Sequence, residues 1–292
     1  MKRVALLVSI LSCIVTHAFS QSPGYDKNRI AISADGNNQP DNHAEAQWPR
    51  ADPDDWGGTP AALAMIAKSG LKNQLVHFSF NNFMEAPAHT TETNYMAEGV
   101  NGAIQRWGFD ASRFFDVPED PSTAITHLAD ELKKSTEADP LYFIHMGPSE
   151  FFYQAVKQVV DGGDIASLAN VRVISHSGYN DNHLRRTAHH TMTQAIELSG
   201  SRIKYKKIVD QNACGNIHKL WCSGTDFSPF HWMRDHADLN IQWLYGRLQF
   251  HPQGKGADIS DAGMVYYLLK GDEYGNLSKL KVLIGDGISL QN

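Results

Sequence analysis

Aspartate and asparagine residues are concentrated in two short stretches near the start of the chain. The first contains Asp35, Asn37, Asn38 and Asp41, and the second contains Asp52, Asp54 and Asp55. Carboxylates this close together repel one another unless a positive charge lies among them. A hard cation bound by carboxylate and carbonyl oxygens would supply that charge, and calcium accepts an irregular oxygen cage more readily than magnesium does. The alternative is a solvated acidic loop, which the same residue types form without any ligand.

Two further segments contain residues that could act on a substrate. In the stretch 176–183, His176 could serve as a general acid or as a hydrogen-bond donor to a sugar, and Asn180 and Asn182 are candidate substrate ligands. The alternative for His176 is a loop histidine that bonds to the backbone. His251 precedes Pro252 shortly upstream of Asp261 and is a second candidate acid.

The elements that must position these residues follow from the hydrophobic pattern. Short apolar runs predict strands at 29–33, 75–80, 141–146 and 171–175, and three-to-four-residue spacing predicts helices at 59–69, 91–107, 121–134 and 149–160. Thr59 is the predicted cap of the first helix, with Pro60 at its first position. This alternation of strands and helices predicts an α/β fold with a mostly parallel central sheet and helices on both faces.

Parallel sheets bind ligands beyond the carboxyl ends of their strands. The segments after Ser33, Phe80, Met146 and Ser175 are therefore predicted to carry the chemistry. The chain has no internal repeat, low-complexity tract or linker. Residues 21–292 are predicted to form a single domain.

Residues 1–20 have the pattern of a secretion signal. Lys2 and Arg3 precede an apolar run, and Ala18-Phe19-Ser20 places small residues before a predicted cut at Gln21. The run is too short to span a bilayer, so a cleaved signal and a secreted or periplasmic protein are expected, and a lipoprotein through Cys13 is the less favoured alternative. No later stretch is long and apolar enough to span a membrane.

The net charge and the cysteine content indicate which kinds of partner and which covalent links the protein could have. Loss of Lys2 and Arg3 would move the formal charge from −6 by two units to −8, which argues against binding to duplex nucleic acid. Cys214 and Cys222 would remain, eight residues apart, and export would allow a disulfide between them. Two reduced buried thiols are the alternative. The sequence leaves the oligomeric state open.

Four segments, in order, resemble the nucleoside hydrolase family. The first is the aspartate-rich loop with its Ala/Leu-rich helix, Asp52-Pro-Asp-Asp-Trp-Gly-Gly-Thr-Pro-Ala-Ala-Leu-Ala-Met-Ile-Ala67, after a strand that ends in Ala34-Asp35-Gly36. The others are Phe80-Asn81-Asn82, the strand 141–146 with its Gly147-Pro148 turn, and Ser260-Asp261-Ala262 before an apolar helix. The chain looks like a distant exported relative of the inosine- and uridine-preferring members, with a similar open sheet.

The resemblance implies roles for particular residues. Calcium would be bound by Asp35, Asp55, Asp261 and the main-chain carbonyl of Met146, and Asp54 and Asn82 would bind sugar hydroxyls. Either Asp35 or Asp52 would take a proton from the attacking water. Such a site would stabilise the positive charge that develops on a sugar when its glycosidic bond breaks.

The sequence also departs from the family pattern. Residues 36–51 separate Asp35 from Asp52, so either aspartate could be the first metal ligand. Ser260 stands where the family commonly has a histidine acid, a place that His251 could fill. The family's Asn- and Glu-bearing loop is not visible after Ser175.

These features predict an exported calcium-dependent hydrolase of an N- or O-glycosidic bond, acting on a nucleoside or small glycoside. An enzyme acting on oligosaccharides from a polysaccharide is a second prediction. A carbohydrate-binding protein of the same fold without turnover is a third.

Overall fold

The computed structural model describes residues 25–36, 54–85, 94–182, 184–212, 221–222, 226–249 and 257–285. Residues 1–20, for which a signal was predicted, lie outside this part of the chain. Within the described residues, no helix combines the length and the apolar character that crossing a membrane would require.

The described strands form one parallel sheet. They are β1 (Arg29–Ala34), β2 (Leu75–Phe80), β3 (Phe114–Asp116), β4 (Leu141–Met146), β5 (Val171–Ser175) and β6 (Lys204–Lys207), in the order β3-β2-β1-β4-β5-β6. Every neighbouring pair is parallel. β1 and β4 are buried almost throughout because both of their faces are covered, which is why their sequences are continuous apolar runs. The predicted α/β fold is confirmed.

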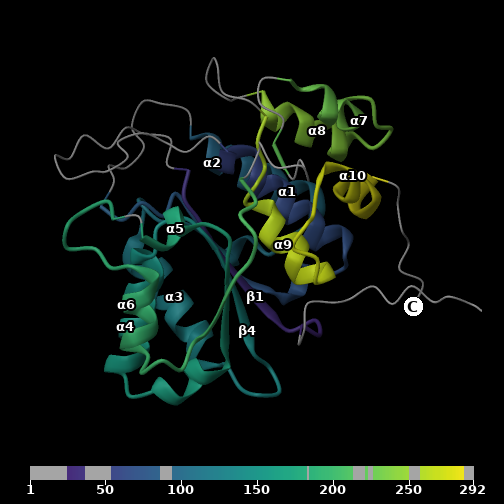
Figure 1. Cartoon of the computed structure of the whole chain (residues 1–292). Coiled ribbons are helices and arrows are strands. Elements are labelled where there is room, and N and C mark those ends of the chain that lie inside the picture. Colours follow the sequence, from purple (N-terminus) through teal and green to yellow (C-terminus); the bar gives the residue numbers. More distant parts are fainter. Residues whose placement is uncertain are drawn as a thin grey trace, which may run out of the picture.

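Helices cover both faces of this sheet (Figure 1). One face packs against α3 (Pro121–Lys133), α4 (Glu150–Asp161) and α6 (Met192–Leu198). On the other face lie α1 (Asp54–Lys68), α2 (Tyr95–Trp107) and α9 (Ala262–Lys270), and the same hydrophobic cluster includes α8 (Leu239–Leu248) and α10 (Leu277–Leu280). Two short helices complete the fold: α5 (Gly178–Asn182) follows β5, and α7 (His231–Arg234) buries Met233 in the same cluster as α8.

The strand order creates a switch point between β1 and β4. From β1 the chain adds β2 and then β3 on one side, and from β4 it adds β5 and then β6 on the other. The loops that leave β1 and β4 therefore diverge, which opens a crevice at the carboxyl ends of these two strands. Asp35 follows β1 and Gly147 follows β4 at this place.

Two predicted helix starts are wrong. The helix predicted from residue 91 begins at Tyr95, where the side chain of Asn94 caps it by accepting from the Ala97 N–H. The first helix begins at Asp54 instead of Thr59, and Pro60 lies inside it. Acidic residues in a first turn are favoured by the helix dipole, so Asp54 and Asp55 belong to the helix. A Cβ on Gly57 would lie 2.7 Å from Leu248 Cδ2, so the first turn of α1 packs closely against α8.

Candidate metal centre

Three aspartates distant in the sequence meet at the switch point. Asp35 follows β1, Asp55 lies in the first turn of α1, and Asp261 directly precedes α9. One carboxylate oxygen from each lies within 4.8 Å of the others, and all three residues are buried. The structure thus brings together the three side chains that were predicted to bind a metal.

Two glycines allow this close approach. A Cβ on Gly147 would lie 2.8 Å from Asn82 Oδ1 and 2.9 Å from both Cβ and the backbone nitrogen of Asp35. Gly36 has φ +79°, and a Cβ there would lie 2.9 Å from the Cβ of Asp55. No side chain fits at 147, and position 36 requires a conformation that glycine adopts without cost.

Met146 offers its main-chain carbonyl at the same edge. This oxygen accepts a hydrogen bond of 3.0 Å from the backbone N–H of Asp35. A carbonyl oxygen has two lone pairs, so the bond leaves one available for the predicted metal contact. The bond also ties the start of the Asp35 loop to the end of β4.

Asn82 follows β2 and presents a buried acceptor. Its amide nitrogen donates to Ser33 Oγ at 2.7 Å, whereas its Oδ1 is buried and has no hydrogen-bond partner among the described residues. A buried acceptor without a partner costs free energy, which a hydroxyl or a cation would offset. This geometry suits the predicted role of Asn82 in substrate binding.

His176 contacts the acidic cluster directly. Its Nε2 lies 2.7 Å from Asp261 Oδ1, and its Nδ1 lies 3.3 Å from Asp210 Oδ1. The backbone nitrogen of Gln211 is 3.1 Å from Nδ1 and can donate to it only when the ring is neutral. Burial lowers the pKa of this imidazole, but the two carboxylates outweigh it and raise the pKa to about 9. His176 therefore offsets one of the three negative charges at neutral pH.

The same contact affects Asp261. Burial alone would raise its pKa, but the hydrogen bond and charge of His176, together with a hydrogen bond to Asp55, hold the pKa below its ordinary value. Two carboxyl groups that hydrogen-bond each other need a proton or a cation between them. The pair Asp55 and Asp261 is therefore suited to a cation.

The predicted asparagine ligands after β5 differ in their surroundings. Asn180 is buried, and its backbone carbonyl lies 3.2 Å from His145 Nε2 and accepts from Ser149 Oγ at 3.3 Å. The Asn182 side chain is turned back to its own helix, where its amide donates to the Gly178 carbonyl at 2.8 Å. Asn182 could bind a substrate only after releasing this bond.

Two aspartates that the sequence analysis did not identify support this region. Asp210 contacts His176, and Asp181 accepts hydrogen bonds from Ser175 Oγ at 2.8 Å and from the Tyr205 hydroxyl at 2.5 Å. Asp210 follows β6, whose sequence Lys-Tyr-Lys-Lys lacks an apolar pattern. The signal that could have found it is the apolar pair Ile208-Val209, which directly precedes an aspartate at a sheet edge.

Several predictions fall outside the described residues. These include Asp52, His251 and Cys214, and Asp54 is described only as the first residue of α1. Cys222 is disulfide-bonded, so a reduced thiol is wrong at that position. The other two cysteines, Cys13 and Cys214, both lie outside the described part of the chain.

The composition of the cluster indicates the kind of ion it could hold. Its candidate side-chain ligands are carboxylate oxygens, with an amide oxygen and a main-chain carbonyl nearby. Oxygen ligands suit hard cations such as calcium, magnesium or manganese, and soft metals prefer sulfur or imidazole. The buried Asp35, Asp55 and Asp261 could hold a metal ion.

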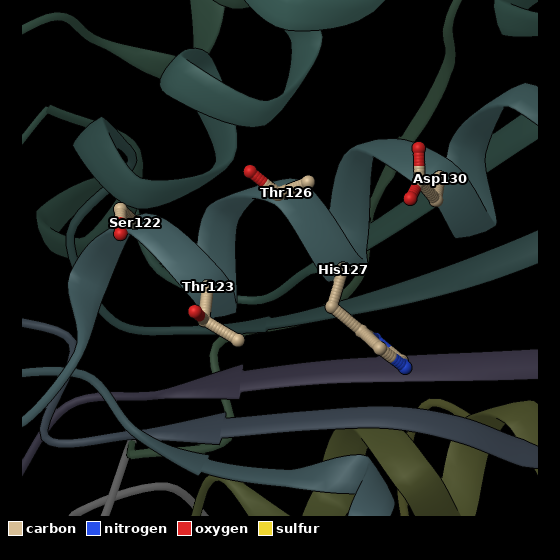
Figure 2. Close-up of a pocket in the computed structure, with 5 residues that line it drawn as sticks. All are labelled: Ser122, Thr123, Thr126, His127 and Asp130. Carbon is tan, nitrogen blue, oxygen red and sulfur yellow. The ribbon is translucent and has the colours of Figure 1, made fainter.

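A separate shallow cavity of about 330 Å³ lies along α3. Figure 2 shows its lining side chains Ser122, Thr123, Thr126, His127 and Asp130, with His127 directed from the helix toward the strands. The Nδ1 atom of His127 lies 3.0 Å from that of His77 on β2. This cavity belongs to a different part of the fold from the three aspartates.

The chain is similar over almost its whole length to a protein of Formosa agariphila named "Uncharacterized protein P22". The two are 27% identical over 287 residues, which cover 91% of this chain and 94% of the relative. No protein-family model matches the chain. The name of the relative gives no activity, so the function must be inferred from the residues.

Proposed function

We propose that the protein is an exported hydrolase that binds a sugar through a calcium ion and cleaves its glycosidic bond. The calcium ion would be bound by Asp35, Asp55 and Asp261. The observation that carries this proposal is the meeting of three buried carboxylates at the switch point between β1 and β4. Burying three carboxylates without compensation would cost several kcal/mol each, and His176 offsets only one of them.

The choice of calcium depends on the ligand types. The ligands come from three separate backbone segments, and such irregular oxygen sites suit calcium better than magnesium, which demands octahedral geometry. The carbonyl of Met146 would complete the protein's share of the ligands. Water or sugar hydroxyls would fill the remaining positions.

The resemblance to nucleoside hydrolases supports a sugar as the ligand. Asp35, Asn82, Gly147 and Asp261, each from one of the four segments that resemble the family, belong to this one edge of the structure. We assign Asn82, with its buried Oδ1, and Asp54 to sugar hydroxyls. The substrate would be a nucleoside, a small glycoside or an oligosaccharide.

The chain's own residues would contribute to cleavage in two ways. The carboxylates would stabilise the positive charge that develops on the sugar ring, and Asp35 or Asp52 would accept a proton from the attacking water. Bound calcium would orient the vicinal hydroxyls of the sugar and acidify a bound water.

His176 is better suited to positioning than to proton donation in this proposal. Both of its ring nitrogens have partners within the protein, and one partner is the metal ligand Asp261. Carboxylate ligands are commonly held in place by such neighbouring hydrogen bonds. His251 would then remain the candidate for the acid that protonates the leaving group.

One observation favours a second candidate, a carbohydrate-binding protein without turnover. Ser260 occupies the place of the family's histidine acid directly before Asp261, and it is buried. If no other acid reaches the leaving group, the same calcium site would bind a sugar without cleaving it.

The metal assignment can be tested by thermal unfolding with and without calcium. We expect calcium to raise Tm, a chelator to reverse the rise, and Asp55→Ala to abolish it, because a ligand that binds only the folded state stabilises that state. Asp164→Ala, at an exposed aspartate, is the matched control and should respond like the wild type. An unchanged Tm on chelation of the wild type would overturn the metal site.

Turnover separates the two candidate functions. The wild type, Asp55→Ala and Asp164→Ala would be assayed with nucleosides, nitrophenyl glycosides and oligosaccharides. Hydrolysis that Asp55→Ala loses supports the enzyme, whereas calcium-dependent sugar binding without hydrolysis supports the binding protein. Hydrolysis that Asp55→Ala retains would show that the cleavage does not use this site.

A further inference from the structure

A small basic cavity lies on the face of the sheet that packs against α9, at the β5–β6 side. Its volume is about 140 Å³, and its lining includes Arg172, Lys204 and Lys206 with the rings of Tyr142 and Tyr267. Tyr142 pairs with Arg172, and Arg172 with Lys204, across three neighbouring strands. These side chains therefore form one row on the same face of the sheet, several residues before the carboxyl edge.

Positive charge exceeds negative charge in this cavity. No carboxylate is among its lining residues, and the ion pair formed there within the described chain joins Lys206 Nζ to Glu273 Oε1 at 2.6 Å. The Nε atom of Arg172 is buried and has no hydrogen-bond partner among the described residues. The guanidinium carbon of Arg172 lies 5.4 Å from the centre of the Tyr142 ring, which holds the charge at the cavity wall.

Protection of an edge strand does not account for this arrangement. Lysines on an edge strand such as β6 discourage pairing with other chains, which would explain Lys204 and Lys206. Arg172, however, lies on β5, which has neighbours on both sides. Its Nε also points to a place where no described group accepts a hydrogen bond. A buried donor without an acceptor destabilises the folded protein, and a ligand oxygen would remove that cost.

We propose that this cavity binds an oxyanion through Arg172 and Lys204. A volume of about 140 Å³ has room for a sulfate, phosphate or carboxylate group. The guanidinium supplies directed N–H donors and the ammonium of Lys204 supplies a mobile charge, the usual combination for such groups. The anion would be either a free ion or the charged group of a larger molecule that extends into solvent.

Calorimetric titration with inorganic phosphate, inorganic sulfate and glucose 6-phosphate tests this proposal. The titrations use the full chain in calcium-free buffer at constant ionic strength, so that the metal site does not interfere. We expect binding by the wild type and an affinity about tenfold or more weaker in Arg172→Gln, since a charge-assisted hydrogen bond is lost. Tighter binding of glucose 6-phosphate than of both inorganic ions would identify a sugar-borne group; equal or weaker binding would identify a free ion.

Matched variants make the result decisive. Arg106 on α2 has a similar environment outside this cavity, since its guanidinium carbon lies 4.6 Å from the centre of the Trp243 ring. The variant Arg106→Gln should therefore bind the anions like the wild type. Lys204 is exposed on the edge strand β6, so Lys204→Gln carries less risk to folding than Arg172→Gln does. Lys204→Gln should also weaken anion binding. Asp55→Ala should bind the anions normally. No binding by the wild type, or equal binding by all variants, would overturn the proposal.

Discussion

Two buried histidines of this sheet have opposite electrostatic surroundings. His77 on β2 stacks against Phe115 and Phe151, and burial together with the neighbouring His127 lowers its pKa well below the ordinary value. His176 after β5 is buried to a similar extent, yet Asp210 and Asp261 raise its pKa to about 9. Burial acts in the same direction at both sites, so the carboxylates make the difference.

The comparison shows where the fold accumulates charge. His77 lies in the middle of the sheet, among aromatic rings that favour a neutral imidazole. His176 lies beyond the carboxyl end of β5, where loops from several strands deliver acidic side chains to one place. The aromatic rings in the middle of the sheet therefore favour an uncharged side chain. The carboxylates at its carboxyl edge favour a positive charge, such as an imidazolium or a metal cation.

The largest expected effect comes from removing a carboxylate at the acidic edge. Asp261→Asn should abolish the proposed stabilisation by calcium, which for the wild type would amount to about 2.7 kcal/mol at a hundredfold excess over Kd. Calorimetric melting with and without calcium measures this loss. The same substitution at exposed Asp164 should leave the stabilisation intact. An Asp261→Asn variant as responsive to calcium as the wild type would show that this carboxylate is not a ligand.

Crowding the acidic edge should have the next largest effect. Gly147→Ala places a methyl group 2.8 Å from Asn82 Oδ1 and 2.9 Å from the Asp35 backbone nitrogen, and such overpacking costs about 2 kcal/mol. Gly246→Ala, in α8 with no atom near the added carbon, should instead stabilise the protein by about 0.5–1 kcal/mol. Urea unfolding of both variants gives the comparison. Equal effects would contradict the close approach at 147.

The aromatic surroundings of His77 predict a sensitivity to acid. Its folded pKa lies below the unfolded value of about 6.5, so the unfolded chain takes up a proton first and stability falls as pH drops below 6.5. At pH 5.5 this costs about 1.4 kcal/mol. His77→Phe, which preserves the ring stacking, should remove that part of the loss between pH 7.5 and 5.5.

A control isolates this effect, because burial also lowers the pKa of His145. Partly exposed His231, replaced by Phe, should keep the full acid sensitivity of the wild type. If His77→Phe and the wild type lose equal stability on acidification, His77 titrates normally in the folded protein.

The interior strands could be predicted from the sequence, and the edge strands could not. β1, β2, β4 and β5 were predicted within one residue because their buried faces require apolar runs. The two outermost strands were missed: β3 has three residues, and β6 is Lys-Tyr-Lys-Lys. An edge strand is half solvated, so its sequence need not carry the apolar signal.

The candidate site, too, could be predicted from the local sequence pattern only in part. The position of Asp35 at the end of a strand followed from the local pattern, but its meeting with Asp55 and Asp261 was expected only from a resemblance between ordered motifs. Asp210 was missed because its role depends on β6 lying beside β5. Local pattern specifies which strand a residue follows, whereas tertiary pairing decides which loops meet.

The smallest expected effect concerns Asp210, the outer of the two carboxylates beside His176. Its side chain is 61% exposed and lies 3.3 Å from Nδ1, whereas Asp261 is buried and lies 2.7 Å from Nε2. Solvent screens an exposed charge, so Asp210→Asn should lower the pKa of His176 less than Asp261→Asn does. NMR titration of the imidazole in chelator-treated protein measures both shifts. The backbone N–H of Gln211 would remain as a partner for Nδ1 in the neutral ring, so the fold should tolerate the change. A larger shift in Asp210→Asn would mean that the outer carboxylate, and not the buried Asp261, sets the charge of His176.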